Sequence, residues 1–159
     1  MAEPSVREAT ERDAEAIHAL AVELAEALGD SPPTPVSVRA RLAELLEEPR
    51  AWVLVAEGEE VVGAASFWVK PDLAHGDAVA EVPMLVVREE RRREGVGKLL
   101  MKEVRRLAAE NDANLIELVA ATQNTQAREF YRSLGFVETD HVVLEFVGDV
   151  EDPPDPDED

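Results

Sequence analysis

The feature that most constrains the fold is a basic, glycine-containing turn at residues 92–98, Arg-Arg-Glu-Gly-Val-Gly-Lys, which joins an apolar segment to a helical pattern. Residues 79–87 are almost wholly apolar, which predicts a buried strand. From about residue 95 to residue 110, apolar residues recur at three- and four-residue intervals, which predicts an amphipathic helix. A strand that turns directly into such a helix requires a sheet with a helix packed on its face.

The turn itself predicts an anion-binding site. A helix start presents backbone N–H groups that have no partner inside the helix, and the helix dipole adds positive charge there. Gly95 and Gly97 let the backbone approach an anion without an intervening Cβ, and Arg92 and Lys98 can add side-chain charge. These residues favour a phosphate binder, and a basic surface turn without a ligand stays open as the alternative.

Two common phosphate-binding motifs do not fit this turn. A P-loop requires Ser or Thr directly after its lysine, where this chain has Leu99. A dinucleotide-binding fingerprint requires a third glycine, where this chain has Leu100, within a regular βαβ unit. The turn therefore indicates a different kind of strand-to-helix phosphate site.

The remaining patterns predict an α/β fold with a mixed, largely antiparallel sheet and flanking helices. Thr10 is expected to cap the first helix, Gly29 to end it, and the second helix to begin at about Ser37. Pro83 lies inside a predicted strand and, because proline cannot donate to a ladder, predicts an irregular or unpaired position. The predicted helices are 11–28, 37–48, 95–110 and 125–134, and the predicted strands are 5–9, 51–57, 60–70, 79–87, 115–121 and two short ones within 136–147.

Residues 1–147 are predicted to form one domain, followed by an acidic tail. Residues 148–159 contain seven acidic residues, no basic ones and three prolines. Such a segment has too little apolar surface to bury, so we expect it to be disordered.

Composition excludes several classes of function. The net charge of −19 repels nucleic acid and anionic membranes. Acidic residues are scattered over every segment, which favours a solvated acidic surface over a field that steers a cationic substrate. The chain has no Cys, which excludes a thiolate nucleophile, a disulfide and a thiolate metal site. Basic residues are mostly Arg, because only Lys70, Lys98 and Lys102 are lysines.

The chain shows no sign of a membrane segment. No apolar run is long enough to span a bilayer, and the first residues lack the charged-then-apolar pattern of a signal peptide. We therefore expect a cytoplasmic protein without nucleic-acid or membrane partners.

A second motif lies at residues 124–136, Asn-Thr-Gln-Ala-Arg-Glu-Phe-Tyr-Arg-Ser-Leu-Gly-Phe. Asn124 is a good helix cap, Ala127 and Tyr131 fall on one helical face, and Gly135 permits a left-handed stop. Taken alone, Tyr131 is interpreted as a core aromatic residue beside Phe130.

Together the two motifs resemble those of the GNAT N-acetyltransferase superfamily. Arg92-x-x-Gly95-x-Gly97 is similar to the motif with which family members wrap the pyrophosphate of acetyl-CoA. Residues 124–136 are similar to the family pattern Asn-x-x-Ala-x-x-Phe-Tyr-x-x-x-Gly-Phe. The resemblance covers about residues 5–147, is sharpest from 79 to 136, and implies a GNAT-like acyl-CoA N-acyltransferase fold.

The resemblance implies acetyl-CoA as co-substrate and no metal. The cofactor-binding residues that it implies are Leu85, Val86, Val87, Arg92, Arg93, Gly95, Val96, Gly97, Lys98, Asn124, Ala127 and Tyr131. It also implies that the fourth and fifth strands splay apart, so that acetyl-pantetheine pairs with the exposed strand edge. Many family members have Gly where this chain has Arg93, and Pro where it has Glu89.

The implied reaction is direct transfer of the acetyl group to an amine of a small molecule or peptide in a ternary complex. Backbone N–H groups at residues 85–87 would stabilise the oxyanion, and Tyr131 would protonate the leaving thiolate. Glu81 is the candidate base, on a strand face that alternation shares with Pro83, Leu85 and Val87. An ordinary solvent-facing carboxylate is the alternative interpretation of Glu81.

Several alternatives stay open. His75 and Asp77 are weaker candidates for the base, and residues 28–38 and Trp68 are candidates for the acceptor wall. A non-catalytic acyl-CoA-binding regulatory module is the main alternative function, and an unrelated nucleotide-phosphate binder is a third. The sequence leaves open whether the protein forms a homodimer.

Overall fold

The computed structural model describes residues 2–151. The chain divides into two compact units, residues 1–124 and the residues from Thr125 onward, and each is described by itself. The predicted disordered tail, residues 148–159, lies largely outside the described residues. No helix within residues 2–151 is long and apolar enough to cross a membrane.

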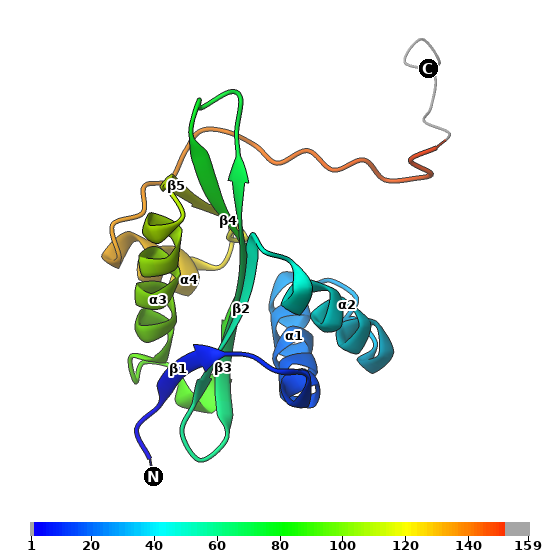
Figure 1. The fold of residues 1–159 in the computed structure, drawn as a ribbon, viewed down its shortest axis with the longest axis vertical. Coiled ribbons are helices and arrows are strands. Elements are labelled where there is room, and N and C mark those ends of the chain that lie inside the picture. Colours follow the sequence, from blue (N-terminus) through cyan, green and yellow to red (C-terminus); the bar gives the residue numbers. More distant parts are fainter. Residues whose placement is uncertain (1, 152–159) are drawn as a thin grey trace. The chain divides into compact units, whose positions relative to one another are not determined.

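The first unit is built around a five-stranded sheet in sequential order, β1-β2-β3-β4-β5 (Figure 1). Neighbouring strands are antiparallel except for β4 and β5, which are parallel. This arrangement confirms the predicted mixed, largely antiparallel sheet. The strands are β1 (Ser5–Glu8), β2 (Ala51–Glu57), β3 (Val61–Pro71), β4 (Ala78–Val87) and β5 (Ala113–Leu118).

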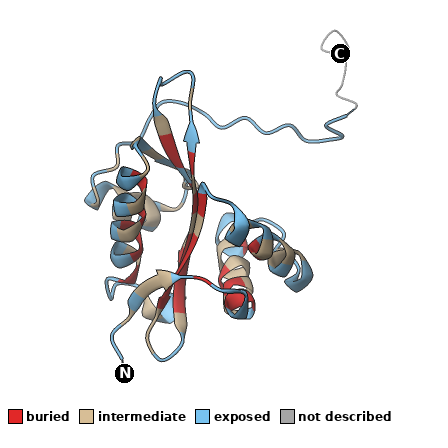
Figure 2. Cartoon of the chain, in the orientation of Figure 1, coloured by how far each residue is buried: buried red, intermediate tan, exposed pale blue. Residues whose placement is uncertain are grey.

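Helices α1 (Ala14–Leu28) and α2 (Pro35–Glu47) lie on one side of the sheet, and α3 (Val96–Glu110) lies on the other (Figure 1). Buried residues follow the centre of the sheet and the helix sides that face it (Figure 2). The core on the α1/α2 side combines residues from both helices with alternate residues of three strands, since side chains alternate between the faces of a strand. Its buried members are Ala9, Ala14, Ile17, Leu20, Leu42, Val53, Val55, Ala64 and Val86.

Local signals set the helix boundaries. Gly29 adopts the left-handed conformation, with φ of 73°, and ends α1 as predicted. Helix α2 begins at Pro35, two residues before the predicted start, because proline is well suited to the first helical position. The Thr34 hydroxyl caps it by accepting a hydrogen bond of 3.1 Å from the Ser37 N–H.

The second unit contains one helix, α4 (Thr125–Ser133), as predicted. The two strands predicted within residues 136–147 are absent, and their apolar side chains, including Val142 and Leu144, are exposed. The prediction was wrong because alternating apolar residues show only that a segment suits a sheet. A strand also needs a neighbour to complete its hydrogen-bond ladder, and none pairs with this segment among the described residues.

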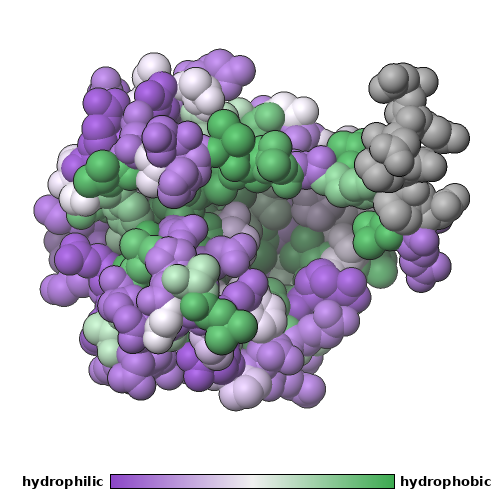
Figure 3. Space-filling model, turned by 90° about the horizontal axis from the view of Figure 1, so that it is seen from above, coloured by the Kyte–Doolittle hydropathy of each residue, from purple (hydrophilic) through white to green (hydrophobic). Residues whose placement is uncertain are grey.

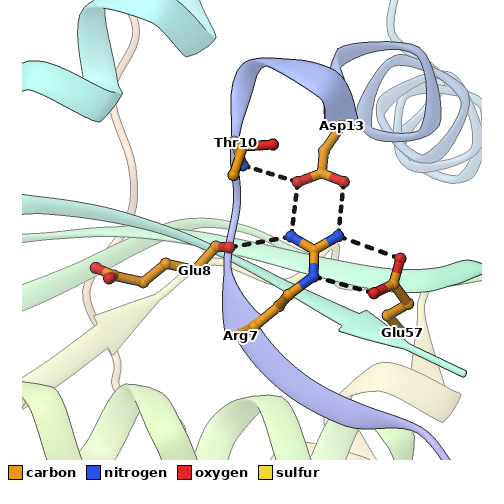
Figure 4. A network of polar contacts seen from close by, with 5 residues as sticks. All are labelled: Arg7, Glu8, Thr10, Asp13 and Glu57. Carbon is orange, nitrogen blue, oxygen red and sulfur yellow. Dashed lines mark hydrogen bonds and ion pairs between the residues drawn. The ribbon is translucent and has the colours of Figure 1, made fainter.

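A polar network joins the start of the chain to the sheet (Figure 4). Arg7 on β1 donates two hydrogen bonds of 2.9 Å to the Asp13 carboxylate, and further bonds to Glu57 on β2 and to the Glu8 carbonyl. Asp13 also accepts a hydrogen bond of 2.8 Å from the Thr10 N–H. Because the Asp13 side chain is only 7% exposed, its buried carboxylate depends on these hydrogen bonds from Arg7 and Thr10.

The outer surface carries the acidic composition. On the face drawn in Figure 3, hydrophilic residues predominate, with hydrophobic patches between them. Most of the described ion pairs are surface pairs of this kind, such as Arg106 with Glu110, which contribute little to stability individually.

We expect Asp13→Asn to lower the free energy of unfolding by about 1–3 kcal/mol, since it leaves the Arg7 guanidinium without its buried carboxylate. The hydrogen bonds from Arg7 lower the pKa of Asp13, so the stabilisation is present above the unfolded pKa of about 4 and is lost as pH falls through the folded value. Urea unfolding at neutral and acidic pH measures both effects. Glu11→Gln, at an exposed position, is the control, and equal stability of the two variants would contradict the role of Asp13.

Candidate active site

Strand β4 loses one of its two neighbours halfway along its length. Its parallel ladder with β5 runs from Ala78 to the pair Val82 and Leu118 and stops there. Its antiparallel ladder with β3 continues to Val87, which pairs with Gly63. The predicted separation of the fourth and fifth strands is therefore present, and β5 ends earlier than predicted because it has lost its ladder partner.

The open edge of β4 exposes the backbone of alternate residues. The Arg88 N–H donates to the Val62 carbonyl oxygen of β3 at 2.9 Å. In an antiparallel ladder, alternate residues direct their backbone polar groups to opposite sides, so those of Val86 point toward β3 and those of Leu85 and Val87 point away. The N–H groups of Leu85 and Val87 are thus available at the open edge, whereas the Val86 side chain packs in the core at 5% exposure.

An irregularity at Pro83 turns Glu81 to the other face of the sheet. Ser66 pairs with Met84 and Trp68 pairs with Glu81, so two steps along β3 correspond to three along β4. This bulge confirms the irregular position predicted at Pro83. It also makes the predicted face of Glu81 wrong, because the extra residue places Glu81 on the α1/α2 face with Met84 rather than on the α3 face.

Glu81 stands in a cluster of polar and aromatic groups beside the end of the β4–β5 ladder. Its carboxylate accepts a hydrogen bond of 3.1 Å from the Lys70 ammonium, which lies 5.4 Å from the centroid of the Trp68 ring. On β5, Glu117 pairs with Glu81 in the parallel ladder, so the two side chains leave the same face of the sheet. Side chains of Glu81 and Lys70 are each about half exposed, at 55% and 52%.

The turn after β4 forms an unpaired helix start. Gly95 caps α3 in the left-handed conformation, with φ of 85°, and the first helical hydrogen bond joins the Leu99 N–H to the Gly95 carbonyl. The N–H groups of Val96, Gly97 and Lys98 precede that bond and therefore have no intrahelical partner. The structure thus has the helix start that the sequence predicted as an anion site.

Arg93 also adopts the left-handed conformation, with φ of 67°. Glycine does so without steric cost, and this explains in physical terms why glycine suits this position. The Arg93 side chain therefore projects from a strained backbone.

The basic residues of the turn divide into paired and unpaired groups. Arg88 contacts Glu60 and Glu90, each at 2.7 Å, and Arg91 contacts Glu94 at 3.0 Å. These carboxylates offset the charge of two of the arginines.

Three other cations of the turn have fewer contacts with carboxylates. Arg92 donates to the Val87 carbonyl oxygen at 3.1 Å and lies 4.0 Å from Glu23 of α1. Arg93 and Lys98 have no ion-pair partner among residues 2–151. Arg92, Arg93 and Lys98 are thus the side chains that can add charge to the helix start.

Two residues that the sequence interpretation missed hold this turn in place. A Cβ on Gly63 would lie 3.1 Å from Val96 and 3.2 Å from Leu100, so glycine lets α3 approach β3 closely at its first turn. A glycine inside a strand pattern is a signal for such an approach. Glu23 accepts a hydrogen bond of 3.1 Å from the Glu89 N–H, a contact that no local pattern in the sequence indicates.

The remaining predicted site residues lie on α4 or directly before it. Ala127 and Tyr131 lie one helical turn apart on α4, and Asn124 directly precedes that helix. The Tyr131 ring packs against Phe130 and Phe136, with ring centroids 5.3 and 5.7 Å apart. Burial raises the pKa of Tyr131 to about 12, so the phenol stays protonated at neutral pH.

The other polar candidates have structural partners. His75 contacts Asp72 at 3.1 Å, and Asp77 accepts a hydrogen bond of 2.7 Å from Asn114. His18 on α1 is hydrogen-bonded to the Pro33 carbonyl oxygen at 3.0 Å. No group of three or more His, Asp or Glu residues suited to a metal ion occurs within residues 2–151.

The two left-handed positions of the turn give opposite predictions. We expect Gly95→Ala to lower the free energy of unfolding by about 1–2 kcal/mol, because a Cβ is disfavoured at its φ of 85°. Arg93→Gly should raise it by up to about 1 kcal/mol, because the same penalty is removed and no described contact is lost. Urea unfolding of both variants measures the difference, and a destabilised Arg93→Gly variant would contradict the strained backbone.

The comparisons with known proteins agree with this geometry. The family model described as "Acetyltransferase (GNAT) family" matches residues 12–136. No curated protein sequence matches the chain.

Solved structures share the fold over nearly the whole chain. A transcriptional regulator from Bacillus halodurans C-125 is 27% identical, with a TM-score of 0.79 over 89% of this chain and 97% of that one. An aminoglycoside N-acetyltransferase in complex with CoA is 19% identical, with a TM-score of 0.78 over 91% and 95%. An aminoglycoside acetyltransferase from an uncultured soil metagenomic sample, in complex with sisomicin, is 21% identical, with a TM-score of 0.70 over 91% and 95%.

Proposed function

The chain belongs to the acetyltransferase (GNAT) family, and we propose that it transfers the acetyl group of acetyl-CoA directly to an amine within a ternary complex. The observation that carries the proposal is the open edge of β4, which leads from the end of the β4–β5 ladder to the unpaired start of α3. An extended acyl chain can pair with the open edge of β4, and a pyrophosphate can bind to the unpaired start of α3.

The residues of the turn suit a pyrophosphate. The N–H groups of Val96, Gly97 and Lys98 meet an anion with the positive end of the α3 dipole. Arg93 and Lys98 have no carboxylate partner among the described residues, so they can approach the anion without breaking an ion pair. Arg92 can turn from the Val87 carbonyl toward the phosphates, which frees that carbonyl for the pantetheine amide groups.

The open edge also suits the chemistry of the thioester. As the amine attacks, negative charge develops on the carbonyl oxygen, and a fixed N–H group stabilises it. Leu85 and Val87 direct their N–H groups into the gap beyond Val82, where water would otherwise satisfy them. We assign the oxyanion contact to one of these two groups.

Glu81 is the proposed base. An alkylammonium has a pKa of about 10.4, so the acceptor must lose a proton before it attacks. The Glu81 carboxylate lies one pair before the ladder ends and already accepts a hydrogen bond from an ammonium group, that of Lys70. An acceptor amine that replaced Lys70 would pass its proton to this carboxylate, directly or through water.

Tyr131 is proposed to assist the leaving sulfur. Complete proton transfer from a phenol with a pKa of about 12 to a thiolate whose acid has a pKa of about 8.5 is uphill by about 5 kcal/mol. A hydrogen bond from the phenol to the developing thiolate avoids that cost and still stabilises the charge. We therefore propose hydrogen-bond donation as the main role of Tyr131.

The acceptor is proposed to be cationic. Glu81 and Glu117 are neighbours on one face of the sheet, and Trp68 adds an aromatic surface in the same row. Carboxylates and an aromatic face are the groups that recognise an ammonium ion. One structural neighbour is an aminoglycoside acetyltransferase that was solved in complex with sisomicin, which makes aminoglycosides the first acceptors to test.

We expect calorimetry to show acetyl-CoA binding more tightly than ATP, and a thiol-release assay to show turnover with a cationic amine.

Gly97→Val should weaken acetyl-CoA binding about tenfold or more, because a β-branched side chain would stand between the helix start and the phosphates. Ala109→Val, at the far end of α3, is the matched control. Tighter binding of ATP, or normal acetyl-CoA affinity in the Gly97 variant, would contradict the assignment of the turn as an acetyl-CoA site.

Tyr131→Phe should lower kcat about 10- to 100-fold, the value of one hydrogen bond to a charged group, and change acetyl-CoA affinity little. Because the pKa of Tyr131 is about 12, the rate of the natural protein should show no loss from tyrosine ionisation below about pH 10. Steady-state kinetics from pH 6 to about pH 10 test both statements. Unchanged kcat in the Phe variant would exclude Tyr131 from the reaction.

A non-catalytic acyl-CoA-binding regulator is the second candidate, favoured by one observation. The 27% identical structural neighbour from Bacillus halodurans is described as a transcriptional regulator. A net charge of −19 disfavours direct contact with DNA, so such a role would act through a protein partner. Binding of acetyl-CoA without thiol release over a broad amine panel would support this function instead.

A further inference from the structure

The Lys70 ammonium occupies the position where the proposed acceptor amine would lie. Lys70 pairs with Val79 across the β3–β4 ladder, yet its side chain leans along the strand to the Glu81 carboxylate. The row of Glu81 is one pair before Val82 and Leu118, where β4 and β5 separate. The Lys70 amine therefore lies closer to the open edge of β4 than its own row in the ladder does.

Two contacts and the exposure of the side chain define this amine position. The Nζ atom lies 3.1 Å from the Glu81 Oε2 and 5.4 Å from the Trp68 ring centroid, and the side chain is 52% exposed. Exposure leaves the amine accessible to a second substrate, and the carboxylate can take its proton. The two other lysines of the chain, Lys98 and Lys102, belong to α3 on the opposite side of the sheet.

We propose that Lys70 is acetylated in the protein's own active site. The inference rests on the proposed function, since acetyl-CoA supplies the acyl group. The Lys70 ammonium loses a proton to Glu81, and the free amine attacks the thioester carbonyl carbon. The C–N bond forms, the C–S bond breaks with its electron pair remaining on sulfur, and the thiolate takes up a proton.

The net reaction converts the lysine ammonium and acetyl-CoA into acetyl-lysine, CoA and one proton. Acetylation removes the positive charge of Lys70 and with it the ion pair to Glu81. Glu81 is then left without its resting partner and can serve an external amine. Lys70 would thus act as a self-substrate whose modification opens the acceptor position.

Mass spectrometry of the full chain tests the proposal. After incubation with acetyl-CoA, the protein should gain the mass of one acetyl group, and peptide mapping should locate it at Lys70. The rate should not depend on protein concentration, because transfer occurs within one molecule. Glu81→Gln should slow it about 100-fold, the usual contribution of a general base.

Lys98 and Lys102 provide internal controls for chemical acetylation by the thioester. Equal modification of all three lysines, or an unchanged rate in Glu81→Gln, would overturn the proposal. Lys70→Arg should abolish the mass gain and leave Lys98 unmodified. Thermal unfolding checks that both variants are folded, as expected for side chains that are half exposed.

Failure of this inference can be told apart from failure of the proposed function. If calorimetry detects no binding of acetyl-CoA, the proposed function fails. If acetyl-CoA binds and a free amine is acetylated while Lys70 stays unmodified, only the self-acetylation is wrong. A rate that rises with protein concentration would show transfer between molecules and would overturn transfer within one chain.

Discussion

The site depends on a single backbone constraint: β4 has hydrogen-bonding groups on both edges but two neighbours only as far as Val82. Beyond that pair, half of its N–H and C=O groups have no strand to satisfy them, and such groups are costly to leave unpaired away from water. The same strand is fixed on its other edge by β3 as far as Val87. The open edge is thus held rigidly, as a site for a pairing ligand must be.

The bulge at Pro83 gives the two sides of this edge different chemistry. It brings Glu81 to the α1/α2 face, whereas α3 and its unpaired start lie against the opposite face. In the proposed reaction, a donor whose phosphates bind at α3 and an acceptor that binds near Glu81 would therefore reach the open edge of β4 from different directions. Each could then be exchanged without displacing the other, as a ternary complex requires.

The family motifs and most elements could be predicted from the sequence, because they depend on local signals. Gly29 and Gly95 mark helix boundaries by their left-handed backbone, and Pro83 marks the bulge through its missing N–H. The face of Glu81 could not be predicted, since one extra residue in a ladder reverses all later alternation.

Strand pairing and long-range contacts also could not be predicted from the sequence. The contact of Glu23 with the Glu89 N–H joins segments that are 66 residues apart, and no periodicity reveals it. The strands expected within residues 136–147 depended on a partner that the sequence does not name. Gly63, in contrast, left a readable signal, because a glycine in a strand often marks a close approach of another backbone.

The small number of lysines limits how many side chains a bound thioester could acetylate. A bound thioester is a reactive acylating agent, and any neutral amine nearby is a target for it. The chain carries most of its positive charge as arginine, with only three lysines among its 16 basic residues. A guanidinium group with a pKa above about 12 stays protonated and does not attack a thioester. In the proposed site, Arg92 and Arg93 would therefore supply charge for the phosphates that is chemically inert toward the thioester of the same ligand.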